Sequence, residues 1–65
     1  MRVEVELEEN GRWIGEIPTL PGVLTYGATA EEARARAEAL ALRVIADRLE
    51  NGESVPPETY ELFAA

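Results

Sequence analysis

The sequence contains no cysteine, histidine or lysine, and each absence excludes a class of chemistry. Without cysteine there are no disulfides, and without cysteine and histidine there is no ordinary structural metal site. The usual catalytic nucleophiles and bases are missing for the same reason. No apolar run approaches the ~20 residues of a membrane span, and the first residues do not resemble a signal peptide. We therefore expect a cytoplasmic protein that is not an enzyme and holds no cofactor or metal.

The chain is small and strongly acidic. Its 65 residues make one domain, residues 1–65, in which burial alone gives marginal stability, so we expect a homo-oligomer, either a dimer or a tetramer. Thirteen acidic residues against six arginines give a formal net charge of −7. Phosphate binding needs a positive patch, so this charge argues against direct binding to nucleic acid and favours a basic protein partner. Acidity that only maintains solubility explains the charge equally well.

Three segments in the first half of the chain have the pattern of β-strands. Residues Arg2–Glu8 alternate strictly between apolar and acidic side chains, which is typical of a half-buried strand. The dipeptide Asn10-Gly11 is a strong hairpin signal, and it precedes a second strand at Trp13–Ile17. A third strand is expected at Val23–Ala28.

A stiff loop joins the second strand to the third. Pro18 and Pro21 fix φ and remove two amide donors, while Gly22 can adopt a positive φ. Leu20, between the prolines, is expected to be held out on this loop. Trp13 can bury a large area, so we expect it to anchor the core rather than to bind a ligand.

A helix is predicted from Ala30 to Glu50. Thr29 caps its start, Glu32 is expected to reach back to the amide of Thr29 in a capping box, and Gly52 provides a left-handed stop. At about 100° per residue, one face of this helix is apolar and small near its start, so it should approach the sheet closely near Ala33. That face consists of Ala30, Ala33, Ala37, Leu40, Ala41, Val44 and Ile45.

Two leucines lie on a flank of the helix, outside this core face. Leu42 and Leu49 are candidates for a contact between subunits, because one helix on one small sheet cannot cover both arcs. The alternative is that the C-terminal segment covers them. Glu32 and Arg36 are spaced for a favourable ion pair on the exposed side.

The C-terminal segment completes the expected fold. Alternation over Tyr60–Phe63 predicts a last strand at Thr59–Ala64, and a right-handed crossover places it beside the first strand. The expected fold class is α+β, β-β-β-α-β, with a four-stranded sheet in the order 3-2-1-4 and one helix on one face. Alternation fixes the side chains of the opposite face, which we predict to bind a partner. They are Glu4, Glu6, Glu8, Glu16 and Glu61, with Ile14 and Phe63 as apolar points.

The central residues resemble the HicB antitoxin family, in which an aromatic residue precedes P-x-L-P-G and then G-x-T-x-E-E-A. The matching positions are Trp13, Gly15, Pro18, Leu20, Pro21, Gly22, Thr25, Gly27, Thr29, Glu31, Glu32 and Ala33. The motif covers about a third of the chain, and Val23 and Ala28 depart from the residues often found in the family. The resemblance implies a partial ribonuclease-H-like fold. It also implies an antitoxin that binds and neutralises HicA, a small basic toxin that cleaves messenger RNA.

Other functions remain open. Longer family members continue into a DNA-binding segment, and this sequence ends at Ala65, so we expect no DNA binding by this chain alone. An orphan, oligomeric HicB-like domain with another protein partner is one alternative. A second alternative is a nuclease in which Glu4, Glu6 and Glu8 hold Mg²⁺ or Mn²⁺. It is less favoured, because no aspartate and no positive groove accompany these glutamates.

Overall fold

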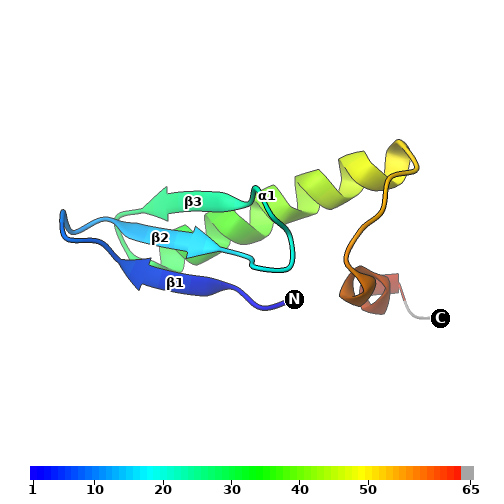
Figure 1. Ribbon diagram of the computed structural model, residues 1–65. Coiled ribbons are helices and arrows are strands. Elements are labelled where there is room, and N and C mark those ends of the chain that lie inside the picture. Colours follow the sequence, from blue (N-terminus) through cyan, green and yellow to red (C-terminus); the bar gives the residue numbers. More distant parts are fainter. Residues whose placement is uncertain (64–65) are drawn as a thin grey trace.

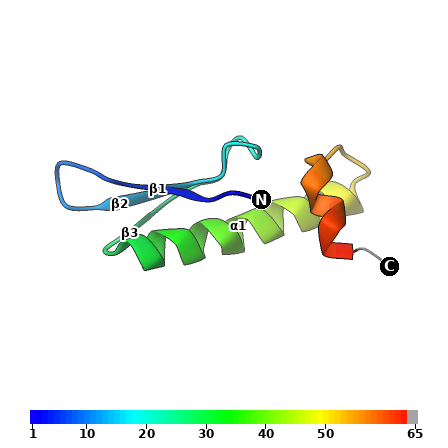
Figure 2. The same ribbon diagram turned by 90° about the horizontal axis from the view of Figure 1, so that it is seen from below.

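The computed structural model of the chain describes residues 1–63, and its elements form two layers (Figures 1 and 2). In chain order they are β1 (Glu4–Leu7), β2 (Trp13–Glu16), β3 (Leu24–Gly27), α1 (Ala30–Glu50) and the 3-10 helix η1 (Pro57–Phe63). The sheet lies on one side of α1, and α1 extends beyond the sheet (Figure 2). At that far end, η1 lies on the same side as the N-terminus and β1 (Figure 1).

The sheet is an antiparallel meander in the order β1-β2-β3. The first three predicted strands are therefore confirmed, each in a shorter form. In the turn between β1 and β2, the Gly11 N–H donates to the Glu8 carbonyl at 3.0 Å. Gly11 takes a φ of 84°, a left-handed conformation in which a residue without Cβ is favoured.

The prediction of a fourth strand is wrong, and the predicted strand order 3-2-1-4 is therefore wrong as well. Residues 57–63 form η1, and Ala64, the last residue of the predicted strand, lies outside the described residues. Pro57 begins η1, a position at which a missing N–H costs a helix nothing. The Thr59 N–H donates to the Pro56 carbonyl at 2.9 Å, so this segment bonds locally instead of pairing with β1. The partial ribonuclease-H-like fold needed that strand. Residues 1–63 instead form a three-stranded sheet, one long helix and one 3-10 helix.

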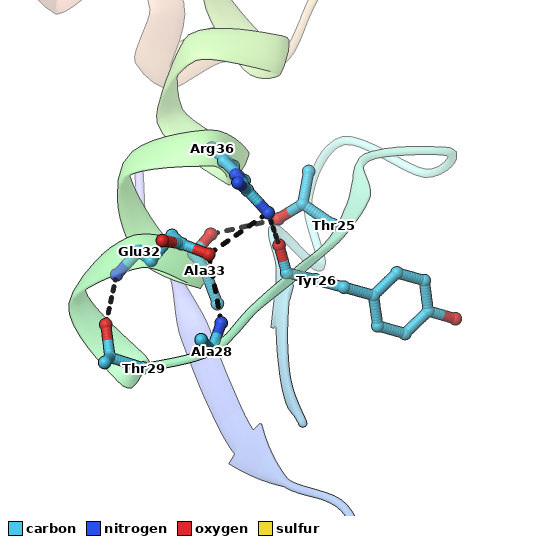
Figure 3. A network of polar contacts seen from close by, with 7 residues as sticks. All are labelled: Thr25, Tyr26, Ala28, Thr29, Glu32, Ala33 and Arg36. Atoms are coloured by element: carbon cyan, nitrogen blue, oxygen red, sulfur yellow. Dashed lines mark hydrogen bonds and ion pairs between the residues drawn. The ribbon is translucent and has the colours of Figure 1, made fainter. Parts of the chain in front are cut away.

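The sheet meets α1 through two glycines. A Cβ atom at Gly15 would lie 2.5 Å from the carbonyl oxygen of Ala33, and one at Gly27 would lie 2.6 Å from the Ala33 nitrogen. Thr25 lies opposite Gly15 on β3, and its Oγ1 donates to the same Ala33 carbonyl at 2.9 Å (Figure 3). Only hydrogen atoms at the two glycine positions allow this spacing. The close approach predicted near Ala33 is confirmed.

The core widens beyond this contact, where larger side chains fill the space between α1 and the end of the sheet. The predicted helix face is confirmed, since the buried residues of α1 all belong to it. The buried core cluster consists of Val3, Ile17, Leu20, Val23, Ala37, Ala41 and Ile45.

Leu20 is completely buried, so the prediction that the loop holds it outward is wrong. The loop folds back in two successive turns, in which the Leu20 N–H donates to the Ile17 carbonyl at 2.9 Å and the Val23 N–H to the Leu20 carbonyl at 3.2 Å. Each proline occupies the second position of its turn, and Gly22 takes the expected positive φ, 95°. These turns aim Leu20 at the second half of α1.

Trp13 is half-buried and lies outside the core cluster, so the expectation that it anchors the core is also corrected. It lies opposite Leu7 and Gly27 at the hairpin end of the sheet. The two layers touch closely near Gly27 through the backbone of Ala33, which leaves no room for an indole between them. Leu20 occupies the central place that was expected for Trp13.

A capping box fixes the start of α1 (Figure 3). The Glu32 N–H donates to Thr29 Oγ1 at 3.1 Å, as predicted. The Glu32 carboxylate accepts from the Ala28 N–H at 3.0 Å, and not from the Thr29 N–H as predicted. Arg36 pairs with that carboxylate at 3.2 Å and donates to the Tyr26 carbonyl at 2.8 Å, which ties the helix to β3.

The end of α1 also agrees with its sequence signal. Gly52 takes a φ of 68°, and its N–H donates to the Leu49 carbonyl at 3.3 Å. The Glu53 N–H donates to the Arg48 carbonyl at 2.8 Å. This pair of bonds is the Schellman arrangement that ends many helices at glycine.

Candidate functional site

The side of the sheet away from α1 is open, and it carries most of the residues predicted to bind a partner. Alternate residues of a strand face the same side, so two rows of side chains cross the three strands on this surface. In register, the rows are Glu4, Glu16 and Leu24, and then Glu6, Ile14 and Tyr26. We call these six residues the acidic face. No element within residues 1–63 covers them (Figure 2).

Like charges meet on the acidic face. Glu4 and Glu16 are directly opposed across β1 and β2, and Glu6 follows two residues along β1. Glu4 pairs with Arg2 at 3.0 Å, an exposed ion pair of small energetic value. Within residues 1–63, neither Glu6 nor Glu16 makes an ion pair. The middle of the face therefore carries carboxylate charge that its neighbours do not neutralise.

The hairpin end of this surface is closer to neutral. Glu8, which was also predicted to bind a partner, follows β1 and pairs with Arg12 at 3.0 Å. The Arg12 guanidinium lies 3.8 Å from the centre of the Tyr26 ring, which is within range of a cation–π contact. Glu6, Glu8 and Ile14 line one shallow depression beside this cluster.

Two predicted residues lie elsewhere. Glu61 and Phe63 were expected on the open face because the last segment was expected to be a strand, whereas both belong to η1. The side chains beside the acidic ones at the other edge of the sheet belong to β3, which pairs with β2: Leu24 is 45% exposed and Tyr26 is 38% exposed. Both sides of β3 are apolar or small, so its sequence alone does not indicate which side faces α1. Register from the preceding strand was the signal that could have resolved it.

Both leucines predicted for a subunit contact are exposed. Leu42 is 59% exposed and Leu49 is 42% exposed, so η1 does not cover them as the alternative required. The outer strands β1 and β3 have no further strand beside them within residues 1–63. An arginine from α1 binds a carbonyl of each outer strand region: Arg36 binds that of Tyr26 at 2.8 Å, and Arg34 that of Val3 at 3.5 Å.

The residues that carry the family resemblance build the scaffold and not the open face. Thr25 and the glycines beside it hold the sheet against α1, the loop turns bury Leu20, and Thr29 and Glu32 start the helix. The remaining motif positions predicted as structural are Trp13, Pro18, Pro21, Gly22 and Gly27. The motif therefore relates to the way the two layers join and not to the acidic face.

Comparison with protein-family profiles, curated proteins and solved structures finds no match to this chain. Within residues 1–63, no three acidic side chains form a group that could hold a metal ion. In the same residues, no helix is both long enough and apolar enough to cross a membrane.

Proposed function

We propose that the acidic face binds a basic protein, and that this partner is a HicA-like toxin that cleaves messenger RNA. In this role the chain is a cytoplasmic, antitoxin-like binding module. The observation that carries the proposal is the opposed pair Glu4 and Glu16, with Glu6 beside it, on a sheet surface that no other element of residues 1–63 covers (Figure 2). The resemblance of residues 13–33 to HicB antitoxins supplies the class of partner.

Electrostatics favours a cationic partner on this surface. Like charges that are directly opposed across two strands cost about 0.2–1 kcal/mol, and a cation placed over them turns that repulsion into attraction. A ribonuclease must use positive charge to hold RNA. A carboxylate surface that binds the same positive charge competes with RNA for it, which is a direct physical route to neutralisation.

Apolar contacts on the same face would slow dissociation. Ile14, Leu24 and Tyr26 lie beside the carboxylates in the two rows, so a partner can bury them while its cations meet Glu6 and Glu16. Buried aromatic and aliphatic side chains at the centre of an interface usually supply most of its binding energy. Charge on this face would mainly set the association rate, and these three side chains the dissociation rate.

The sheet surface is too small to be the whole interface. Three strands of four residues span roughly 13 Å along the strands and roughly 10 Å across them, given ~3.3 Å per residue and ~4.8 Å between strands. A stable interface buries about 800 Å² on each partner. The partner must therefore also contact the β1–β2 hairpin or the loop of residues 18–22.

A second candidate function is supported by the exposure of Leu42 and Leu49, which lie two turns apart on α1. An orphan oligomeric domain would use this flank, together with the outer strands, to contact other copies. Two acidic faces would repel one another, so self-association would leave the acidic face free. The two functions are therefore compatible.

Co-expression tests the proposed partner. HicA-like ribonucleases from the source genome would be expressed with a tagged copy of this chain, and we expect one of them to co-purify and to lose its toxicity. Glu4→Lys with Glu6→Lys should weaken this rescue. Glu50→Lys with Glu53→Lys changes the net charge equally at exposed positions away from the sheet, and it should rescue like wild type. Failure of every ribonuclease to co-purify would contradict the proposal.

A further inference from the structure

A groove opens at the end of the molecule where the N-terminus, the second half of α1 and η1 meet. Its volume is about 430 Å³, and it shares no residue with the acidic face. Val3, Ala41 and Ile45, which belong to the core cluster, also line this groove. Leu42 from α1 and Leu62 from η1 line it as well, and both are exposed. Leu42 thus belongs to a concave apolar surface, which its position on the flank of the helix did not predict.

Carboxylates accompany these apolar side chains. Glu38 lines the groove from α1, and Glu58 and Glu61 line it from η1, while no arginine within residues 1–63 does so. Met1 lines the groove as well, and the positive charge of its N-terminal ammonium acts on Glu58, so Glu38 and Glu61 are the carboxylates left for a cationic ligand. A second copy of this chain, with a net charge of −7, would bring further negative charge to the same place. Charge complementarity therefore favours a cationic occupant over a second copy.

The groove also contains a polar group that lacks a partner. Thr59 lines it and is completely buried, and within residues 1–63 its hydroxyl makes no hydrogen bond. Buried side-chain polar atoms are nearly always hydrogen-bonded in native proteins, so each exception calls for a physical reason. Because this hydroxyl is closed off from solvent, η1 has to shift slightly before a ligand in the groove can complete the missing hydrogen bond.

Its neighbour Glu58 fixes this side of the groove. The Thr19 hydroxyl donates to the Glu58 carboxylate at 2.6 Å, which connects η1 to the loop of residues 18–22. The wall formed by η1 is therefore attached to the body of the molecule at a point next to Thr59. A ligand in the groove therefore contacts an η1 that is held in place by this hydrogen bond.

We propose that this groove binds a short segment of a basic protein, with a leucine-sized side chain between Leu42 and Leu62 and flanking arginines or lysines against Glu38 and Glu61. The site does not depend on the acidic face, and it stands whether or not that face binds a toxin. One partner that reaches around the edge of β1 can occupy both surfaces. A separate partner can occupy the groove alone.

A peptide titration followed by NMR tests the site without any knowledge of the natural partner. The probe is the acetylated, amidated pentapeptide Arg-Leu-Arg-Leu-Arg, and the matched control peptide carries serine in place of both leucines. We expect saturable shifts of the amide signals of Leu42, Thr59 and Leu62 with the leucine peptide, which weaken as salt rises. Shifts of equal size with the serine peptide, or shifts confined to the acidic face, would overturn the proposal.

Paired variants sharpen the result. Leu42→Ser should weaken binding about fivefold or more, whereas Leu7→Ser, at a leucine of β1 that is 55% exposed and lies outside the groove, should not change it. Glu38→Lys with Glu61→Lys should abolish saturable binding, and Glu50→Lys with Glu53→Lys should retain it. Unchanged binding by the Glu38 and Glu61 double variant would contradict the site. So would a Leu42→Ser variant that changes only the size of an oligomer, since a second copy would then be the occupant.

Discussion

Replacement of Gly15 by alanine tests how the two layers of this protein are joined. The added Cβ atom would lie 2.5 Å from the Ala33 carbonyl oxygen and 2.9 Å from its carbonyl carbon. Both are backbone atoms inside a helix, so they cannot rotate aside as a flexible side chain could. To restore ordinary contact, α1 has to move away from the sheet by about 1 Å.

The cost follows from what that movement breaks. Overpacking of a tight interior contact costs about 1–3 kcal/mol. The shift also breaks the 2.9 Å hydrogen bond from Thr25 Oγ1 to the Ala33 carbonyl, which adds about 1 kcal/mol. We therefore expect Gly15→Ala to lower the free energy of unfolding by about 2–4 kcal/mol. A chain of this size has roughly 3–10 kcal/mol in total, so the variant should be close to unfolding.

Urea denaturation followed by circular dichroism measures this loss, and Gly11→Ala is the matched control. Gly11 has a positive φ, but a Cβ atom there meets no atom of residues 1–63 within 4 Å. Its replacement carries only the conformational cost of about 1–2 kcal/mol. If Gly15→Ala is no less stable than Gly11→Ala, the close contact between β2 and α1 is not what holds the layers together.

Three further predictions concern the helix cap, the contact between η1 and the loop, and self-association. Thr29→Ala should lower the free energy of unfolding in urea by about 0.5–2 kcal/mol, because the Glu32 N–H loses its acceptor; an unchanged midpoint would contradict the capping box. The hydrogen bond from the Thr19 hydroxyl holds the pKa of Glu58 below its ordinary value of 4.5, so this contact stabilises the fold above that value and is lost as the pH falls through the lowered pKa. Thr19→Val should raise the pKa of Glu58, as followed by the NMR signal of its carboxyl carbon, and an unaltered titration would mean that the hydroxyl does not act on it. Leu49→Glu, on the flank of α1 outside the groove, should reduce the assembly size in light scattering at micromolar concentration, and a wild-type protein that is folded and strictly monomeric would exclude this contact.

Features that depend on neighbouring residues were predictable from the sequence. The capping residue Thr29 and the stop at Gly52 act within one turn, so the bounds of α1 were predicted correctly. Strict alternation from Arg2 to Glu8 similarly located β1 and the side on which its glutamates lie. The row of alanines along α1 predicted the close approach at Ala33, because small side chains are what permit it.

Features that depend on competition between local and distant contacts were not predictable in this way. Tyr60–Phe63 alternate over only four residues, too few to separate a strand from a 3-10 turn, and the stronger signal was Pro57 at a helix start. Once that segment forms η1, Phe63 leaves the open face and becomes a 66% exposed side chain at the other end of the molecule. The burial of Leu20 could not be predicted, because it depends on the direction that two consecutive turns give to the chain.

The acidic face was predictable in its charge and not in its apolar contacts. Glu4, Glu6 and Glu16 followed from the alternation of two strands, and the register brings them together as expected. Leu24 and Tyr26 join them because of the pairing between β2 and β3, which alternation within one strand does not define. The groove beside η1 was missed because it exists only where three segments distant in sequence meet.

We propose that charge on the acidic face captures a basic ribonuclease. The most direct test is the association rate with the HicA-like ribonuclease that co-purifies, measured against salt for wild type, for Glu4→Lys with Glu6→Lys, and for the control Glu50→Lys with Glu53→Lys. We predict that the reversal on the acidic face lowers the association rate about tenfold or more and flattens its salt dependence, while the control behaves like wild type. If the variant reversed at Glu4 and Glu6 captures and silences the toxin as fast and as completely as wild type, the acidic face is not the binding surface.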